Sequence, residues 1–365
     1  MVPHVAGVEM DSMDYRQLGR SGLRISTLTM GTMSFGGSGP FANVGDTDVK
    51  GARRQLAMCR EHGVNMVDTA DVYSGGRSEE IVGEALGDSR DDWLIATKVR
   101  FPMGDGPNDA GLSRHHIIEG AAASLRRLRT DRIDLYQLHQ WDGQTPIEET
   151  LSALQTLIDQ GKVRYVGVSN YSGWHLLKAL GTADRLGLPR FASEQIYYSL
   201  QARDAENELL PAAADQGLGV LVWSPLAGGL LSGKYSRGRD GEIKGPQGSR
   251  QMTEWSEPPI DFPDRLFRTI DALKKIGRAH DVSAAQVALA WLLTRPAVTS
   301  LVVGARNERQ LADNLAAADL VLDPAEVAKL ETVSRPPLLY PYWHQRNAAS
   351  ERLSAADRVL LEPYL

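Results

Sequence analysis

Four polar residues lie at or just beyond the ends of three short apolar segments. Asp68 ends the first segment and Tyr73 follows it by five residues, Lys98 ends the second, and His139 ends the third. Short apolar runs of this kind are typical of buried strands. Parallel strands in α/β folds place their functional groups at a common C-terminal edge. We therefore expect these four side chains to converge at one rim.

The four side-chain types suit proton donation to a carbonyl oxygen. A free phenol titrates near pH 10, so Tyr73 needs a nearby cation to act as an acid at neutral pH. Lys98 supplies that cation, Asp68 neutralises it in a dry site, and His139 orients the carbonyl or relays the proton. None of the four is an obvious strong nucleophile, so the hydride must come from elsewhere. Taken singly, a buried Asp68–Lys98 ion pair and a satisfied core histidine remain alternative interpretations.

The chain resembles the aldo-keto reductase family. The resemblance rests on the ordered set Asp68, Tyr73, Lys98 and His139, and on the segment 63–73, which is close to a family signature. Among bacterial-type members, it is similar to the potassium-channel β-subunit-like branch. The resemblance implies an α/β fold, a (β/α)8 (TIM) barrel with long C-terminal rim loops. It also implies a nicotinamide cofactor.

Alternating apolar segments and helical patterns predict the same architecture. The alternation around Ser21–Gly22 in 15–26 indicates a hairpin, which could plug the bottom of a barrel as the similar family segment does. Strands are expected at 28–31, up to 68, and at 94–98, 133–139, 162–170, 191–195, 219–223 and 299–304. Helices are expected at 46–62, from about 78, and at 113–129, 146–160, 265–280, 284–294 and 324–334. The stretch 236–263 is rich in Gly, Pro and Ser and is interpreted as a long loop over the barrel mouth. Such a loop could become ordered when the cofactor binds.

Neutral polar groups end two later strands, and an aromatic ends a third. Ser169, Asn170 and Gln195 can offer a carboxamide both donors and acceptors, and the resemblance implies that they hold the nicotinamide amide. Ser169 and Asn170 can also be read as strand-end or capping residues. The resemblance places Trp223 against the nicotinamide ring, where many family members carry Tyr.

A Gly-rich turn follows Trp223, where backbone N–H groups can approach a pyrophosphate. The residues assigned to the cofactor there are Ser224, Pro225, Leu226, Gly228, Leu230, Gly233 and Lys234. The chain has no Gly-x-Gly-x-x-Gly after an early strand and no Gly-x-x-x-x-Gly-Lys-Ser/Thr. A Rossmann or P-loop site is therefore not expected.

The stretch 304–314 predicts a phosphate site. Gly304 joins a strand to a helix N-terminus, which favours anions, and Arg306 adds a guanidinium suited to a phosphate monoester. Arg309 is the competing candidate. By resemblance, Gln310 and Asn314 contact the phosphate and the adenine. These residues favour NADPH over NADH as the cofactor.

Composition and charge bound the remaining expectations. The 365 residues carry a formal net charge of −6, which gives no footprint for nucleic acid or anionic lipid. The single Cys59 excludes an intrachain disulfide and fits a reducing cytoplasm. No metal is expected, since His115–His116 reads as a surface pair. The expected parts are a leader (1–14), the barrel (15–335) and a tail (336–365) that packs on the barrel or a partner subunit.

The sequence thus predicts NADPH-dependent, reversible reduction of an aldehyde or ketone. Trp141 and Trp255 are expected to line the substrate pocket. A nicotinamide-binding regulatory subunit that senses redox state remains an alternative, as does a metal-assisted hydrolase or lyase. The substrate and the choice between monomer and homo-oligomer stay open.

Overall fold

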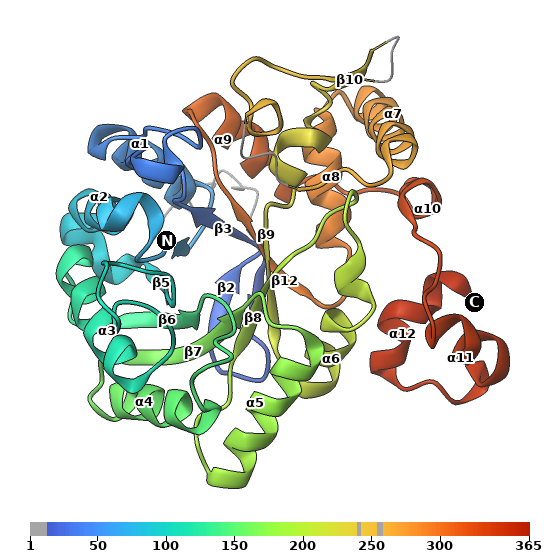
Figure 1. Ribbon diagram of the computed structural model, residues 1–365. Coiled ribbons are helices and arrows are strands. Elements are labelled where there is room, and N and C mark those ends of the chain that lie inside the picture. The colour runs from blue at the N-terminus through green and yellow to red at the C-terminus, as the bar shows by residue number, and fades with distance from the viewer. Residues whose placement is uncertain (1–12, 239–241, 254–257) are drawn as a thin grey trace, which may run out of the picture.

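Eight parallel strands close into a barrel in the computed structural model, which describes residues 13–238, 242–253 and 258–365. Neighbouring strands follow the chain order, and the last, β12, pairs with both β3 and β9 (Figure 1). The strands are β3 Leu28–Gly31, β4 Met66–Asp68, β5 Leu94–Val99, β6 Ile133–Leu138, β7 Val163–Ser169, β8 Ser193–Tyr197, β9 Gly219–Trp223 and β12 Val298–Val303. The expected (β/α)8 barrel is confirmed.

Helices surround the barrel, and polar side chains define where several of them begin. They are α1 Val49–Glu61, α2 Arg77–Leu86, α3 Arg114–Leu128, α4 Ile147–Asp159, α5 Gly173–Leu186, α6 Leu209–Gln216, α7 Pro263–His280, α8 Ala284–Leu293, α9 Glu308–Leu315 and α10 Pro324–Ser334 (Figure 1). Asp48, Ser113 and Ser283 each accept a hydrogen bond from a first-turn backbone N–H, which satisfies a donor with no partner inside the helix. Caps of this kind place α1 and α3 one to three residues inside the predicted ranges.

A hairpin closes the N-terminal end of the barrel. Its strands, β1 Tyr15–Gln17 and β2 Arg24–Ser26, pair antiparallel. Leu18 and Ile25 are fully buried in a cluster with interior residues of the barrel strands. Arg20 N–H also donates to the carbonyl oxygen of Gly217, before β9. The expected plug is therefore present.

The period-two alternation of the strands builds the floor of the site. Met66, Ala96 and Leu135 belong to the same interior cluster as the hairpin residues. Side chains two residues apart on a strand point to the same face. The next inward positions on β4, β5 and β6 therefore lie one layer closer to the C-terminal rim, and polar residues occupy all three.

Beyond the barrel, the chain adds a rim excursion and a helical tail. Within the excursion, β10 Ser236–Arg237 pairs with β11 Ile243–Lys244. In the tail, α11 Tyr342–Ala348 precedes α12 Ala355–Leu361, and α12 packs against α6 (Figure 1). Tyr342 Oη donates to Glu208 Oε1 at 2.5 Å, just before α6. Among the described helices, none has the length and apolar character needed to cross a membrane.

Candidate active site

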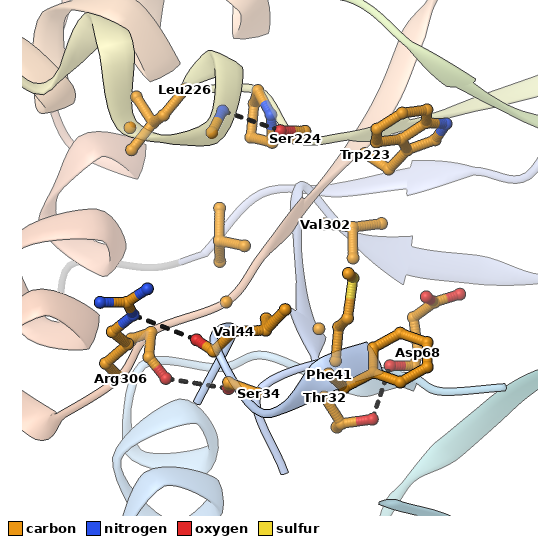
Figure 2. A pocket seen from close by; sticks show the side chains of 18 of the residues that line it. Thr32, Ser34, Phe41, Val44, Asp68, Trp223, Ser224, Leu226, Val302 and Arg306 are labelled. Carbon is orange, nitrogen blue, oxygen red and sulfur yellow. Dashed lines mark hydrogen bonds between the residues drawn. The ribbon is translucent and has the colours of Figure 1, made fainter. Parts of the chain in front are cut away.

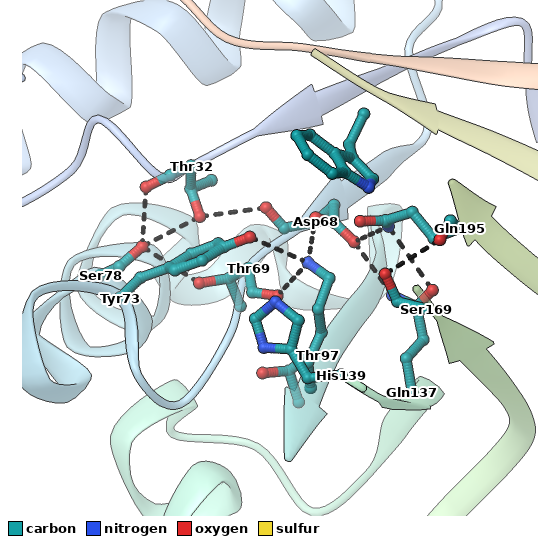
Figure 3. A network of polar contacts seen from close by, with 12 residues as sticks. Thr32, Asp68, Thr69, Tyr73, Ser78, Thr97, Gln137, His139, Ser169 and Gln195 are labelled. Carbon is teal, nitrogen blue, oxygen red and sulfur yellow. Dashed lines mark hydrogen bonds and ion pairs between the residues drawn. The ribbon is translucent and has the colours of Figure 1, made fainter. Parts of the chain in front are cut away.

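Lys98 joins the predicted acid and phenol at the C-terminal rim. Its Nζ lies 2.5 Å from Asp68 Oδ1, 2.9 Å from the carbonyl oxygen of Thr69 and 3.3 Å from Tyr73 Oη. Lys98 has no exposed surface, and Asp68 is almost fully buried. The ammonium therefore bridges the phenol and the carboxylate. Figure 3 shows the polar network around Asp68 and Tyr73.

The turn after β4 directs the Tyr73 ring into the rim. Ser74, Gly75 and Gly76 all have left-handed backbone angles, with φ of 51°, 64° and 94°, so the chain reverses directly after Tyr73. Phe41 packs edge-on against the Tyr73 ring, with 5.6 Å between ring centroids. The phenol is thus held between Phe41 and the Lys98 ammonium.

His139 completes the set as a neutral imidazole. Its ring lies edge-on to Tyr73 at 5.8 Å and to Phe101 at 4.8 Å. Burial lowers the pKa of His139 well below its ordinary value, and the positive charges of Lys98 and Arg100 lower it further. A neutral imidazole offers one donor and one acceptor nitrogen, so it can orient a carbonyl without adding charge.

Electrostatics keep the Lys98 side chain protonated. Burial opposes the charged form, but the attraction of Asp68 and Tyr73 outweighs it and raises the pKa of Lys98 above its ordinary value. A persistent ammonium 3.3 Å from the Tyr73 hydroxyl stabilises the phenolate form of that tyrosine. The arrangement can therefore make a phenol a stronger acid.

Two glutamines bind the other oxygen of Asp68. Gln195 Nε2 donates to Asp68 Oδ2 at 2.8 Å and Gln137 Nε2 donates to it at 3.0 Å. The sequence analysis did not single out Gln137. The alternation of side chains along β6 could have identified it, because Gln137 lies two residues after Leu135 of the interior cluster and so points to the same face.

A cavity of about 920 Å³ extends from this site across the rim. Figure 2 shows Trp223 and Asp68 toward one end and Arg306 toward the other, with Ser224 between the ends and Leu226 across from Arg306. The predicted residues that line it are Asp68, Tyr73, His139, Ser169, Asn170, Gln195, Trp223, Ser224, Pro225, Leu226, Gly228, Lys234, Gly304, Arg306, Gln310 and Asn314. The sequence analysis missed several lining residues, among them Phe41, Val72, Phe101, Pro102, Gln247 and Ser249.

Three predicted residues lie elsewhere. Leu230 is fully buried in the hydrophobic core and Gly233 packs near Ala284, so neither lines the cavity. Trp141 does not line it either, because its ring stacks on His175 at 4.4 Å, at the start of α5. Trp255 lies outside the residues that the structure describes.

The residues expected to hold a carboxamide are already linked to one another. Ser169 Oγ donates to the carbonyl oxygen of Gln195 at 2.9 Å. Asn170 Nδ2 donates to the carbonyl oxygen of His139, and Asn170 Oδ1 accepts from Trp223 Nε1 at 3.0 Å. Asn170 therefore ties the Trp223 indole to the strand end that carries His139.

Arg306 connects its end of the cavity to two loops. Its guanidinium donates to the carbonyl oxygens of Asn43 and Val44, at 2.7 and 3.1 Å, and to that of Gly248 at 3.2 Å. Figure 2 shows the bond to Val44. Within the described residues, these bonds engage three of its five N–H groups. The side chain remains exposed, so it can still meet an anion.

The turn after β9 forms a cradle of backbone groups. Gly228 N–H donates to Ser224 Oγ at 3.0 Å, and Gly228 and Gly229 have φ of 62° and 98°. Successive N–H groups in such turns favour anions. A long cleft with a flat indole at one end, this turn in the middle and a guanidinium at the other fits a dinucleotide. In the described part of the chain, no cluster of three His, Cys, Asp or Glu residues could hold a metal ion.

Comparison with known proteins agrees with this geometry. Residues 27–335 match the model of the Aldo/keto reductase family. The chain is 43% identical over 329 residues to an Arabidopsis thaliana protein named "Probable voltage-gated potassium channel subunit beta", covering 88% of this chain and 96% of that protein. It is 40% identical to the "Uncharacterized oxidoreductase YrpG" of Bacillus subtilis (85% and 93% covered), and 32% identical to the "Versiconal hemiacetal acetate reductase" of Aspergillus parasiticus (90% and 99% covered). The chain therefore belongs to the aldo/keto reductase family.

Proposed function

We propose that this protein reduces an aldehyde or ketone to an alcohol with NADPH, and that the reaction is reversible. The observation that carries the proposal is the chain of contacts from Asp68 through Lys98 to the hydroxyl of Tyr73, at 2.5 and 3.3 Å. That hydroxyl faces a cavity also lined by His139. A phenol held beside a buried ammonium is suited to protonate a developing alkoxide.

Each residue has a distinct part in the proton transfer. Tyr73 donates its proton to the carbonyl oxygen, and Lys98 stabilises the negative charge that remains on the phenolate. Asp68 holds Lys98 in place and keeps the buried ammonium paired. His139, neutral because its pKa is lowered by burial and by Lys98 and Arg100, orients the same oxygen.

The cofactor would lie along the cleft. Bound NADPH supplies the hydride. Trp223 would hold the nicotinamide end, the turn at 224–234 the pyrophosphate, and Arg306 the phosphate monoester of the adenosine. The exposure of Arg306 and the two N–H groups that no described residue engages support this choice over NADH. The oxidoreductase and reductase names of two relatives support the reaction class.

A second candidate function is a nicotinamide-binding regulatory subunit with weak turnover. The relative named as a potassium channel subunit β, 43% identical along most of both chains, favours it. Such a protein would bind NADPH yet show negligible turnover over a broad carbonyl panel. It would also retain a membrane-protein partner specifically in a pull-down.

Cofactor binding and turnover, measured on the same preparations, test the proposal. NADPH fluorescence titration gives the affinity, and loss of NADPH absorbance over a panel of aldehydes and ketones gives the rate. We expect Tyr73→Phe to retain NADPH affinity and to lose about 10²-fold or more in kcat, the scale of general acid catalysis. Unchanged kcat in Tyr73→Phe would overturn the role of Tyr73, and absence of turnover in the unmodified protein would favour the regulatory subunit.

A further inference from the structure

The carboxylate of Asp68 accepts hydrogen bonds from opposite sides. Lys98 binds Oδ1, whereas Gln137 and Gln195 both bind Oδ2. Figure 3 shows the two glutamines approaching Asp68 from the side away from Tyr73. Asp68, Gln137 and Gln195 come from β4, β6 and β8, which are alternate strands of the barrel. Alternate strands supply the side chains of one interior layer in such barrels.

Gln137 has no cavity-lining position of its own. It is fully buried, and it is absent from the residues that line the described cavity. Its Oε1 lies 3.5 Å from Gln195 Nε2, at the limit of a hydrogen bond. Its direct link to the proposed reaction is therefore the 3.0 Å bond to Asp68.

This bond affects how Lys98 acts on Tyr73. A donor on Oδ2 draws carboxylate charge away from Oδ1, and hydrogen bonds to charged groups are among the strong ones. When the Asp68 oxygen that faces Lys98 carries less negative charge, it offsets less of the positive charge of the ammonium. More of that positive charge then acts on the Tyr73 hydroxyl. We propose that Gln137 is a positioning residue, which sets through Asp68 how much of the Lys98 charge stabilises the phenolate of Tyr73. The consequence for catalysis rests on the proposed function.

Other charged groups near the pair are few within the described residues. His139, directly after β6, faces Tyr73 and is kept neutral mainly by burial, and the positive charge of Arg100 lowers its pKa further. Asp71, three residues after the end of β4, also interacts with Lys98, but the Lys98 charge lowers the pKa of Asp71 less than burial raises it. None of these groups contacts Gln137 by a described hydrogen bond, so a substitution there acts on Tyr73 through Asp68.

The test measures the acidity of Tyr73 directly. The ultraviolet absorbance of tyrosinate is titrated in each protein and in the same protein with Tyr73→Phe added, so that the difference isolates one of the 11 tyrosines. Gln137→Met keeps the volume and removes the donor. We expect it to raise the apparent pKa of Tyr73 by about 0.5–1 unit and to lower kcat about threefold to tenfold, with KM and NADPH affinity unchanged.

Two further variants separate this effect from general damage to the barrel. Ser300→Ala removes a buried hydrogen bond to Thr29, of 2.8 Å, away from Asp68, and should leave the titration of Tyr73 unchanged. Gln137→Glu donates to Asp68 only while its own carboxyl is protonated. It should therefore keep near-normal kcat while the introduced carboxyl is protonated, and lose kcat once rising pH ionises that carboxyl and ends its donation. The neighbouring Asp68 carboxylate should move this loss above the ordinary pKa of a glutamate, because like charges disfavour the ionised form.

The outcomes distinguish the two proposals. If Tyr73 titrates at the same pH in both Gln137 variants as in the unmodified protein, the role of Gln137 is wrong. An equal shift in Ser300→Ala would also overturn it. If the unmodified protein shows no turnover, the proposed reaction fails, but the tyrosinate titration still decides the role of Gln137.

Discussion

Replacing the buried Arg203 should be among the most damaging single changes in this protein. Its guanidinium donates two hydrogen bonds of 2.9 Å to the Glu206 carboxylate and one of 2.7 Å to the Glu331 carboxylate, and 1% of its side chain is exposed. Arg203→Met leaves two carboxylates behind. Glu331 keeps the Arg295 guanidinium at 2.5 Å, whereas the Glu206 carboxylate keeps, among the side chains that the structure describes, only the Tyr198 hydroxyl. One buried negative charge therefore loses its cation.

The expected loss follows from that stranded charge. Removing one partner of a buried ion pair costs about 3–5 kcal/mol. That is a large fraction of the roughly 5–15 kcal/mol that separates folded from unfolded domains. In a thermal melt followed by circular dichroism, it corresponds to a fall of roughly 4–7 °C in Tm for a chain of 365 residues. Turnover at temperatures well below the transition should change little, because Arg203 does not line the described cavity.

The loss of stability in Arg203→Met should depend on pH in a definite direction. In the Arg203→Met protein, the carboxyl of Glu206 loses its cation in a buried site, so its folded-state pKa should rise above that of the unfolded chain. A group with a raised folded-state pKa stabilises the fold below the unfolded value and loses that stabilisation as pH rises through the folded value. The deficit relative to the unmodified protein should therefore shrink as pH falls toward 4.

A surface pair provides the matched control. Arg185 lies 3.2 Å from Glu148, but both side chains are about half exposed or more, and such pairs contribute about 1 kcal/mol or less. Arg185→Met should therefore leave Tm nearly unchanged. The reasoning is refuted if Arg203→Met costs no more than Arg185→Met, or if its deficit is the same at every pH.

Three further predictions concern the cleft and a buried thiol. Arg306→Ala should weaken NADPH binding about tenfold to a hundredfold and NADH binding much less, the scale of one or two charged hydrogen bonds; equal losses for both cofactors, or a matching loss in Arg309→Ala, would contradict the assignment. Because the pKa of His139 is well below its ordinary value, kcat/KM should show no acid limb near pH 6.5, and such a limb abolished by His139→Gln would argue against a neutral imidazole. Burial raises the pKa of Cys59 to about 12, so iodoacetamide should modify it only after denaturation, as intact-mass measurement would show.

The strands were predictable because each combines a short apolar run with a polar end. The structure ends β4 at Asp68 and β9 at Trp223, as expected, and ends β5 one residue beyond Lys98. The same reasoning could have identified Gln137 as a site residue. Inward side chains recur every second residue, so the step from Leu135 to Gln137 predicts a polar group beside Asp68.

Other features depend on contacts between distant parts of the chain. Arg306 binds carbonyl oxygens of Asn43 and Gly248, which its local sequence does not indicate. Trp141 follows His139 by two residues, yet its ring stacks on His175 because α5 begins beside it. Leu230 stands in a Gly-rich turn, but its apolar side chain is buried in the core. Such placements follow from packing and not from local pattern.

Single-turnover hydride transfer tests the central claim most directly. The unmodified protein and Tyr73→Phe, each saturated with NADPH, are mixed with excess aldehyde, and nicotinamide oxidation is followed by stopped-flow absorbance across pH. We expect the Tyr73→Phe rate to be lower by about 10²-fold or more, with loss of the basic limb of the pH profile and unchanged NADPH affinity. Equal rates with the same pH profile in both proteins would contradict the account of Tyr73 as the proton donor.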